Sequence, residues 1–249
     1  MHQSNSLIFL TIIGLTLGKE LPDGFKRCRR NDPKLGQCLL QAVTDVLPQM
    51  KDGLPDFGIA SIDPLAINAL TIQQGKNSPI NLKQDFKNIH LSGISETRLT
   101  KYNPDLNNYI LRCEGLTPRV DFVGDYTMEG RILLLPITGK GKANITMMGL
   151  KTVHELIGEP IKKKGEVYIR FKDYHIKLLP KRVYLNFENL FNGDKVLGEN
   201  MNRFMNENWE LIFNELKGGY EDTFSFVFKD VTNKIFTKVP MNKIFLLDE

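Results

Sequence analysis

The hydrophobic residues of this chain recur with two different periods, and the change between the two most restricts the possible fold. From about residue 59 to residue 190, apolar and polar residues alternate in short runs separated by Gly, Pro and Asn. Such alternation is typical of β-strands with one buried face. From about residue 195, apolar residues recur every three or four positions, which predicts helix. Because strand follows strand with no helical pattern between, we expect a largely antiparallel sheet and an α+β fold.

The strand region is divided by turn residues. Turns are predicted at Asn103–Pro104, at Gly139 and Gly141, and at Gly165. The segment 132–135 is apolar at every position, so part of the sheet is expected to be covered on both faces. The predicted strands include residues 86–94, 109–113, 120–128, 132–137, 167–179 and 183–187.

Helical patterns flank the predicted sheet. Before it, Asp32 is the expected N-cap of a helix with Pro33 at its first position. After it, a helix from about Lys195 is expected to stop at Gly218 and Gly219, because glycine favours helix ends. A second apolar stripe follows, from Phe224 to Ile235.

The first eighteen residues predict a secretory signal peptide. They carry no Asp, Glu, Lys or Arg, and the apolar stretch 7–17 is too short to cross a bilayer. No later stretch approaches the roughly twenty apolar residues of a membrane helix, so no stable membrane insertion is expected. We therefore expect residues 1–18 to be removed, leaving one secreted, extracellular domain of residues 19–249.

Charge excludes one class of partner. The chain has 33 basic and 29 acidic residues, a net charge of +4, and the two signs are interleaved. A nucleic-acid-binding surface needs a concentrated basic stripe, so no nucleic acid partner is expected.

If the protein is secreted, its cysteines can form a disulfide and one asparagine can be glycosylated. In an oxidising compartment Cys28 and Cys38 are the expected disulfide pair, and Cys113 is left as a free, buried thiol. An exposed thiol or an intermolecular bridge is the alternative for Cys113. Asn144 begins an Asn-x-Thr sequence with Thr146, so it is the predicted glycosylation acceptor.

Catalytic and metal-binding patterns were sought among the histidines and glycines. Once His2 leaves with the signal peptide, His90, His154 and His175 are the imidazoles available, and none has a partner at metal-ligand spacing. The sequence contains no nucleophile-elbow motif and no phosphate-binding loop motif. We expect no catalytic residue, no metal and no cofactor.

Four stretches, taken in order along the chain, carry a family resemblance. They are Cys28 and Cys38 around a helix start, residues 62–75, residues 191–200 and residues 204–209. Together they resemble the insect takeout and juvenile-hormone-binding protein family over essentially residues 20–245. The lone Cys113 cannot form the second disulfide of the hormone carriers, so the sequence is most similar to the takeout branch.

The resemblance implies a strongly curved antiparallel sheet that wraps around a long C-terminal helix and encloses an apolar tunnel. The implied ligand is a small hydrophobic molecule, such as a juvenile-hormone-like terpenoid, a fatty acid or another lipid. Tyr126 is the expected polar anchor, unless a backbone carbonyl satisfies its hydroxyl. Candidate lining residues are Ile62, Leu65, Ile67, Leu70, Phe122, Tyr126, Leu133, Trp209 and Phe213.

Two other functions remain open from the sequence. One is an extracellular signalling module that acts through an unknown receptor, with circadian or feeding regulation among the family's roles. It predicts an exposed apolar patch. The other is ester hydrolysis, which needs a nucleophile beside one of the three histidines.

Overall fold

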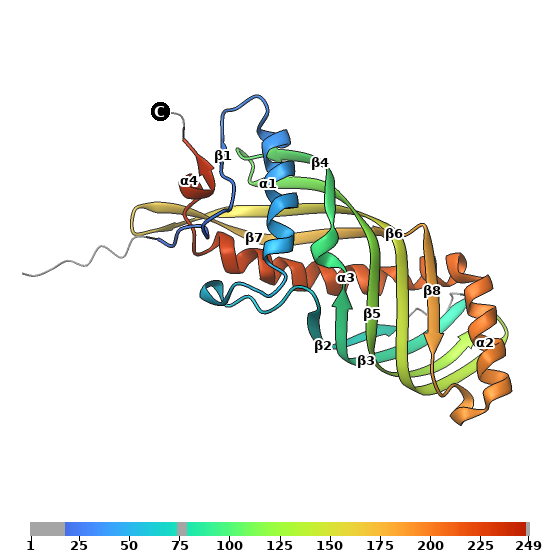
Figure 1. The fold of residues 1–249 in the computed structure, drawn as a ribbon. Coiled ribbons are helices and arrows are strands. Elements are labelled where there is room, and N and C mark those ends of the chain that lie inside the picture. Colours follow the sequence, from blue (N-terminus) through green and yellow to red (C-terminus); the bar gives the residue numbers. More distant parts are fainter. Residues whose placement is uncertain (1–17, 74–78, 248–249) are drawn as a thin grey trace, which may run out of the picture.

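The computed structural model describes residues 18–73 and 79–247 (Figure 1). The helices are α1 (Leu35–Gln49), α2 (Lys195–Glu207), α3 (Trp209–Phe236) and α4 (Met241–Ile244), with short 3₁₀ helices η1 (Pro55–Phe57), η2 (Ile94–Glu96) and η3 (Phe191–Gly193). The strands are β1 (Cys28–Arg29), β2 (Leu65–Gln73), β3 (Ile80–Ser92), β4 (Arg98–Asp105), β5 (Ile110–Ile132), β6 (Leu135–Lys163), β7 (Glu166–Leu179), β8 (Arg182–Phe187) and β9 (Phe245–Leu246). Most of the predicted signal peptide lies outside the described residues.

Seven strands form one antiparallel sheet in the order β2-β3-β5-β6-β7, with β4 added beside β5 and β8 added beside β6. Strand β6 is 29 residues long, and it pairs with β5 along most of its length. Its opposite edge pairs with β8 over residues 143–148 and with β7 over residues 151–163. The long strands β5 and β6 therefore connect the two ends of the molecule.

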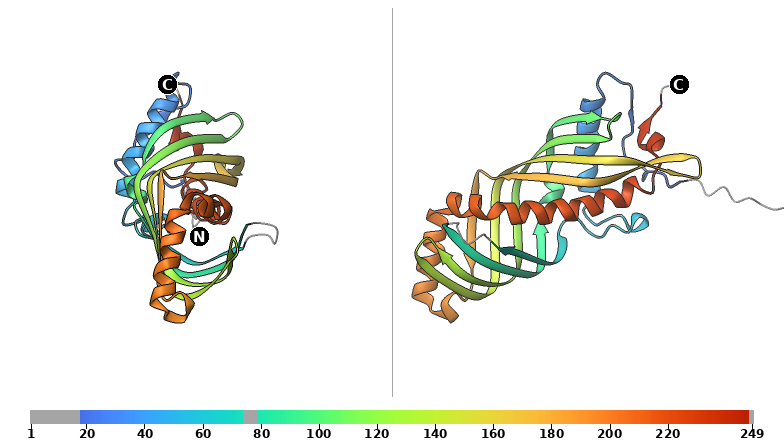
Figure 2. Two further views of the ribbon diagram at one scale, coloured as in Figure 1. Left: turned by 90° about the vertical axis from the view of Figure 1, so that its right-hand side faces the viewer. Right: turned by 180° about the vertical axis from the view of Figure 1, so that it is seen from behind.

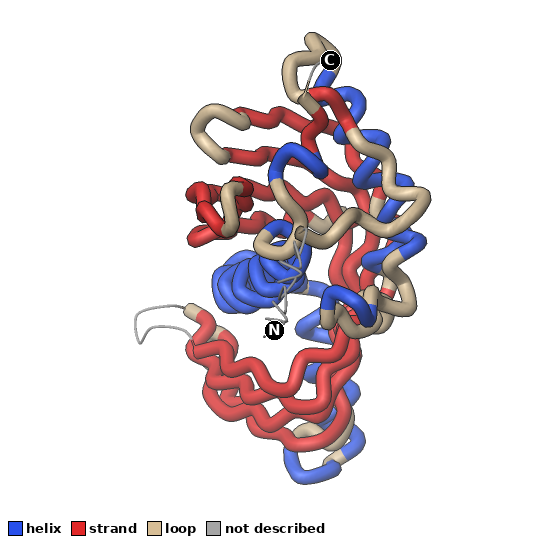
Figure 3. The backbone as a smooth tube through the Cα atoms, turned by 90° about the vertical axis from the view of Figure 1, so that its left-hand side faces the viewer, coloured by secondary structure: helices blue, strands red, loops and turns tan. Residues whose placement is uncertain are grey.

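The sheet curls around α3, as Figure 3 shows with the helix seen end on. Inward positions of β5 alternate regularly with outward ones: Val120, Phe122, Tyr126 and Met128 are buried. A sheet with one apolar face buries it by wrapping around another element, here the long helix. The α+β fold with a curved antiparallel sheet around a C-terminal helix is thus confirmed.

The buried residues form two cores. The half-barrel core joins β2, β3, β5, β6, β7 and β8 to α2 and to α3 as far as Phe224, and Phe86, Phe122 and Tyr220 are among its members. The α1 core joins α1 to the N-terminal arm, η1, parts of β5, β6 and β7, and the C-terminal segment, with Leu39 and Phe245 among its members. Figure 2 shows these two ends of the elongated molecule from two further directions.

Helix side chains cover the open edges of β7 and β8. Asn206 of α2 accepts from the backbone N–H of Leu185 (2.9 Å) and donates to the carbonyl of the same residue (2.6 Å). Asn202 makes the same pair of bonds with Phe187, and Asn233 of α3 makes it with Phe171. An uncovered strand edge leaves backbone N–H and C=O groups without hydrogen-bond partners. These side-chain amides supply the partners that a further strand would otherwise provide.

Two glycines expected to end a helix lie inside α3. The helix runs from Trp209 through Gly218 and Gly219 to Phe236, and the break falls earlier, at Asn208 between α2 and α3. A Cβ added at Gly219 would lie 2.9 Å from Cγ2 of Ile72, whereas at Gly218 no atom of the described residues outside the helix's own backbone comes within 4 Å. The prediction of a stop was therefore wrong, because Gly219 serves close approach of helix and sheet.

Two of the three predicted turns are also wrong. Pro104 lies in β4, which pairs only with β5 and so can lack one backbone donor at its outer edge. Gly139 lies in β6, where a Cβ would come within 2.5 Å of the Tyr126 hydroxyl and 2.8 Å of Leu190. Gly141 lies in the same strand, against the backbone of Glu188. The turn at Gly165 is confirmed between β6 and β7.

The apolar segment predicted as a strand covered on both faces is instead the exposed tip of the β5–β6 hairpin. Leu134 is 91% exposed, and Leu133 and Leu135 are each exposed by more than two fifths. Only Ile132 and Ile137, which belong to the flanking strands, are buried.

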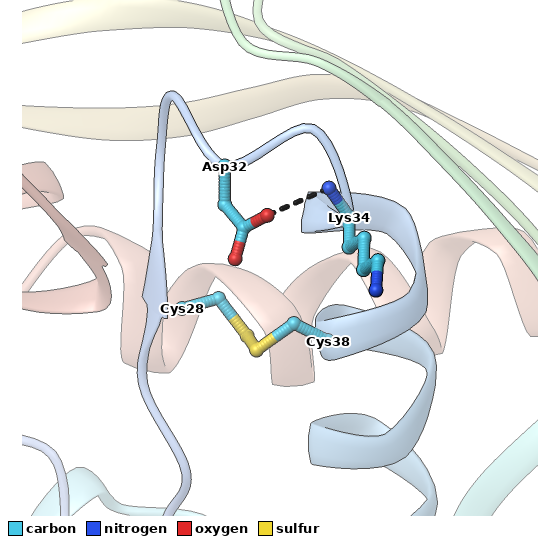
Figure 4. Close-up of a disulfide and its surroundings, with 4 residues drawn as sticks. All are labelled: Cys28, Asp32, Lys34 and Cys38. Atoms are coloured by element: carbon cyan, nitrogen blue, oxygen red, sulfur yellow. Dashed lines mark hydrogen bonds between the residues drawn. A yellow bond between two sulfur atoms is a disulfide. The ribbon is translucent and has the colours of Figure 1, made fainter.

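The N-terminal arm is attached to α1 by the predicted disulfide between Cys28 and Cys38 (Figure 4). The Asp32 carboxylate accepts a hydrogen bond from the backbone N–H of Lys34 (2.7 Å), and α1 begins at Leu35. The N-cap residue of α1 is Lys34, so the prediction of Asp32 as the N-cap with Pro33 at the first helical position is wrong by two residues. Among the described residues, no helix combines the length and the apolar character needed to cross a membrane.

Candidate ligand-binding cavity

A cavity of about 270 Å³ lies between α1, the concave face of the sheet and α3. It is found where the half-barrel core and the α1 core meet, and residues of both cores form its wall. The lining residues are Val43, Val46, Leu47, Met50, Ile62, Leu65, Leu91, Ile94, Thr97, Leu99, Tyr102, Leu111, Cys113, Thr117, Val120, Met147, Leu150, Thr152, His154, Leu156, Tyr174, Ile176, Leu178, Phe224, Phe228, Val231, Thr232, Ile235 and Phe236.

Helical spacing supplies two walls of this cavity. In α1 and at its C-cap, apolar residues recur at three- and four-residue intervals and so face one side of the helix: Val43, Val46, Leu47 and the C-cap Met50. In α3 the stripe from Phe224 to Ile235, noted from the sequence, provides the opposite wall. Apolar side chains that face a neighbour and still leave space are the usual lining of a small-molecule site.

The other end of the half-barrel is filled. Phe86 and Phe122 meet edge to face at 5.1 Å between ring centroids, and Tyr220 lies 5.9 Å from Phe122. A small void of about 10 Å³ there, beside Gln84, is roughly the size of one water molecule. The large cavity is thus confined to the end of the molecule that carries α1.

Polar groups cross the cavity wall in a row. Tyr102 of β4 is paired with Cys113 of β5, and Cys113 is paired with His154 of β6. Directly paired residues project from the same face of a sheet, so these three side chains lie next to one another. Tyr174 of β7 completes the group from the neighbouring strand. All polar lining residues among those described are Thr97, Tyr102, Cys113, Thr117, Thr152, His154, Tyr174 and Thr232.

His154 is held at both ring nitrogens. Its Nδ1 lies 2.9 Å from the Tyr174 hydroxyl, and its Nε2 lies 2.7 Å from the Thr152 hydroxyl. Burial lowers the pKa of His154 to about 4, because the charged imidazolium would lose its water. The imidazole is therefore neutral at physiological pH and is a hydrogen-bonding group of the wall.

The other titratable groups of the cavity are also neutral. Burial raises the pKa of the Cys113 thiol to about 12, with the charge of Glu114 adding to the effect. Burial raises the pKa of Tyr102 and of Tyr174 well above the usual value, and neighbouring Cys113 adds to both shifts. No Asp, Glu, Lys or Arg is found among the described residues that line the cavity.

Nothing in this arrangement provides a metal site: among the described residues, no group of three or more His, Cys, Asp or Glu side chains could hold an ion. His90 and His175 lie on exposed positions of β3 and β7, away from the cavity.

Only two of the predicted lining residues, Ile62 and Leu65, line this cavity. The others lie elsewhere, and the structure does not bring them together with these two around one space. Leu133 is 41% exposed at the hairpin tip. Trp209, at the start of α3, packs beside the guanidinium of Arg182, 5.5 Å from its ring centroid. The remaining five are members of the half-barrel core: Ile67, Leu70, Phe122, Tyr126 and Phe213.

Tyr126 does not reach the cavity as a polar anchor. Its hydroxyl donates to the backbone carbonyl of Glu188 at 2.6 Å, and burial raises its pKa to about 12. The alternative of a satisfied backbone contact therefore holds.

The motif that begins at Ile62 has a structural role as well. The Asp63 carboxylate accepts hydrogen bonds from the backbone N–H groups of Gly93 (2.9 Å) and Ser95 (3.1 Å) and from the Ser95 hydroxyl. Partial burial opposes ionisation, but these hydrogen bonds outweigh it and lower the pKa of Asp63. They fix η2, so that Ile94 contributes to the cavity wall.

The predicted glycosylation acceptor, Asn144, is exposed on the outer face of β6. Its accessibility is compatible with that prediction, which stays a prediction.

The comparisons with known proteins agree on one family. Residues 6–246 match the family described as haemolymph juvenile hormone binding protein. The circadian clock-controlled protein daywake of Drosophila melanogaster is 23% identical, over 98% of this chain and 99% of that protein. A putative beta-carotene-binding protein of Schistocerca gregaria is 23% identical, over 59% of this chain and 58% of that protein.

A solved structure gives the same assignment. Takeout 1 of Epiphyas postvittana is 26% identical and has a TM-score of 0.78, covering 89% of this chain and all of that one. The takeout and juvenile-hormone-binding resemblance found in the sequence is thereby confirmed. With a family match that extends to β9 and a curled sheet that encloses an apolar cavity beside α3, the chain belongs to the haemolymph juvenile hormone binding protein family.

Proposed function

We propose that this protein is a secreted carrier that holds one small hydrophobic molecule in the cavity between α1, the sheet and α3. The observation that carries the proposal is the cavity itself, about 270 Å³ of space with a wall that is mostly aliphatic and aromatic. A folded chain that leaves such a space loses packing energy, which a bound apolar molecule would restore. The family is one of proteins that bind small hydrophobic ligands.

The size of the cavity limits the ligand. A cavity of about 150 Å³ accepts a benzene-sized molecule, and typical small-molecule sites span about 300 to 1,000 Å³. A ligand of roughly ten to twenty non-hydrogen atoms matches this space. The name of the Schistocerca relative refers to beta-carotene, which is far larger than the cavity, so a shorter terpenoid or acyl compound is favoured here.

Secretion is supported by two features. The apolar, uncharged segment 1–18 has the character of a signal peptide, and the Cys28–Cys38 disulfide suits an oxidising compartment. The matching family is described as a haemolymph protein family.

The experiment combines ligand identification with a blocked cavity. We expect organic extracts of protein purified from its native source to contain a lipid-like compound detectable by mass spectrometry. Val231→Trp fills the cavity from α3 and is expected to lower affinity for N-phenyl-1-naphthylamine, a fluorescent apolar dye, at least about tenfold. Val196→Trp, on an exposed position of α2, is the control and is expected to bind normally. Equal binding by both variants, or an empty extract with no dye binding, would contradict the proposal.

A second function, action through a protein partner, is favoured by one observation. The hairpin tip Leu133–Leu135 is apolar and exposed, as the interaction hypothesis requires, and the name of the Drosophila relative refers to circadian control. Leu134→Asp would then abolish capture of a receptor from tissue while leaving dye binding intact. If carriage is the function, Val231→Trp is expected to lower dye binding, and Leu134→Asp is expected to leave it unchanged.

Ester hydrolysis has little support from the cavity. His154 lies beside Cys113, but a thiol with a pKa of about 12 supplies almost no thiolate at neutral pH. The low pKa of His154 also makes it a weak base.

A further inference from the structure

We propose that Tyr102 and the hydrogen-bonded chain Tyr174–His154–Thr152 form a polar subsite that selects an uncharged ligand bearing an acceptor oxygen, and that the cavity rejects ionised fatty acids. This inference rests on the proposed carrier function and names the chemical class of its ligand.

The hydrogen-bonded chain Tyr174–His154–Thr152 carries one polar hydrogen more than its two internal hydrogen bonds use. The Tyr174 hydroxyl, the neutral His154 ring and the Thr152 hydroxyl carry three polar hydrogens, and the two hydrogen bonds between them use two. If Nδ1 carries the ring proton, the Tyr174 hydroxyl is left free to donate. If Nε2 carries it, the Thr152 hydroxyl is left free. Either tautomer therefore presents one uncommitted O–H donor on the cavity wall.

Tyr102 supplies a second donor. It lines the cavity, and its hydroxyl has no hydrogen-bond partner among the described residues. By contrast, the hydroxyls of Thr97 and Thr117 lie 2.7 Å apart and bond to each other. A hydroxyl on the wall of an apolar cavity can donate to a ligand oxygen, and such a hydrogen bond adds affinity.

The described wall of the cavity carries no charge that could compensate an ionised ligand. The titratable groups that line the cavity are Tyr102, Cys113, His154 and Tyr174, and all four are neutral at physiological pH. No described lining residue is basic. A carboxylate placed there would lose its hydration without meeting a cation, whereas an ester, ketone, ether or alcohol oxygen needs only the donors.

Together these features favour neutral oxygenated ligands over two close analogues. A hydrocarbon of equal size leaves the donors unpaired. A fatty acid must bind as its protonated form, which is roughly one molecule in several hundred at neutral pH.

The test uses three matched probes: methyl dodecanoate, dodecanoic acid and pentadecane, each displacing N-phenyl-1-naphthylamine from the full protein. At about pH 7.5, methyl dodecanoate is expected to bind at least about 100-fold more tightly than dodecanoic acid. Between about pH 7.5 and pH 5.5, acid affinity is expected to rise about tenfold per pH unit while ester affinity stays constant.

Two variants locate the subsite. Tyr102→Phe and Tyr174→Phe each remove one hydroxyl and keep the ring, so each is expected to weaken methyl dodecanoate about 3- to 10-fold and to leave pentadecane unchanged. Tyr220→Phe is the matched control, because Tyr220 is a buried tyrosine of the half-barrel core outside this cavity.

The outcomes separate the two proposals. Equal binding of acid and ester at about pH 7.5, or wild-type ester affinity in both tyrosine variants, would overturn the polar subsite while leaving carriage of an apolar ligand intact. Failure of all three probes and of the dye to bind would instead contradict the carrier function itself.

Discussion

His154 is a buried imidazole whose ring nitrogens contact two hydroxyl groups, those of Tyr174 and Thr152. Its pKa is about 4 in the folded protein and near 6.5 when the side chain is exposed. Below pH 6.5 the unfolded chain therefore binds more protons than the folded one, so acid favours unfolding.

We expect the stabilisation that depends on neutral His154 to be complete above about pH 6.5 and to be lost as the pH falls through 4. The resulting decrease in the free energy of unfolding is expected to total about 3 kcal/mol. Chemical denaturation at a series of pH values measures it. His154→Gln is expected to flatten this part of the profile, and the exposed His175→Gln is expected to keep it. Identical acid profiles for wild type and His154→Gln would contradict the assignment.

At the residue scale, the sequence identified Ile62 and Leu65 as cavity residues but missed Tyr102, His154 and Tyr174. The alternation of apolar and polar residues in a strand tells which face a side chain occupies. It does not tell which residues are paired across strands, and the row Tyr102–Cys113–His154 exists only through the register of β4, β5 and β6. One signal was present in the sequence: Cys113 was expected to be a buried free thiol, and it is a free, half-buried residue of the cavity wall.

Among the elements, α2 depends on its two inward amides. Asn202 and Asn206 each both donate to and accept from one residue of β8, and no strand lies on that side of β8 in the described sheet. Asn206→Ala is expected to lower the free energy of unfolding by about 1 to 3 kcal/mol, because it leaves a strand N–H and C=O without partners. Urea denaturation measures the loss.

The exposed Asn200→Ala on the same helix is the control and is expected to change stability by less than about 0.5 kcal/mol. Equal effects at both positions would show that helix propensity, and not coverage of the strand edge, is being measured.

The two adjacent glycines of α3 make a matched pair. In the described part of the chain, the new methyl group of Gly218→Ala meets no atom within 4 Å outside its own helix backbone. This variant is expected to stabilise the protein by about 0.5 to 1 kcal/mol, since alanine is the better helix former. Gly219→Ala places a Cβ 2.9 Å from the buried, branched Ile72 and is expected to destabilise by about 1 to 3 kcal/mol. Thermal unfolding of the two variants should shift in opposite directions, and a gain at both positions would contradict the close-packing explanation.

Glycine is also where element prediction from sequence failed. Gly139 and Gly219 were assigned to a turn and to a helix end, whereas each allows a close tertiary contact inside a regular element. Long-range packing of this kind leaves no trace in local sequence. The strands β7 and β8, which contain no glycine, were predicted to within one residue at each end.

At the scale of the whole molecule, the two chain ends are held together. Strand β1 pairs in parallel with β9, and the disulfide from Cys28 attaches the same arm to α1. Residues of β1, β9 and α1 belong to one core, and α1 forms part of the cavity wall. Loss of the disulfide is therefore expected to affect the end of the molecule that holds the cavity.

Replacing both Cys28 and Cys38 by Ser is expected to lower the free energy of unfolding by about 2 to 3 kcal/mol, the usual effect of a short disulfide loop. Denaturation with and without reductant measures it. Reduced wild type is expected to match the variant, and a stability that is insensitive to both changes would refute the expectation.

The overall architecture was predictable because it follows from the two hydrophobic periods and from the family resemblance. The order of strands and the division of β6 between β7 and β8 were not, because many antiparallel orders satisfy the same alternation. The position of the cavity could not be predicted from the sequence either, since it depends on how completely side chains fill each end of the half-barrel.

The amides that cover β7 and β8 come from residues 202–233, whereas both strands are complete at Phe187. During synthesis all strands of this sheet therefore leave the ribosome before the helices that shield their edges. Until α2 and α3 dock, a nascent chain exposes two strand borders that could pair with another copy. Folding yield should consequently depend on how quickly the last fifth of the polypeptide is added, and chains that end before α2 are expected to aggregate.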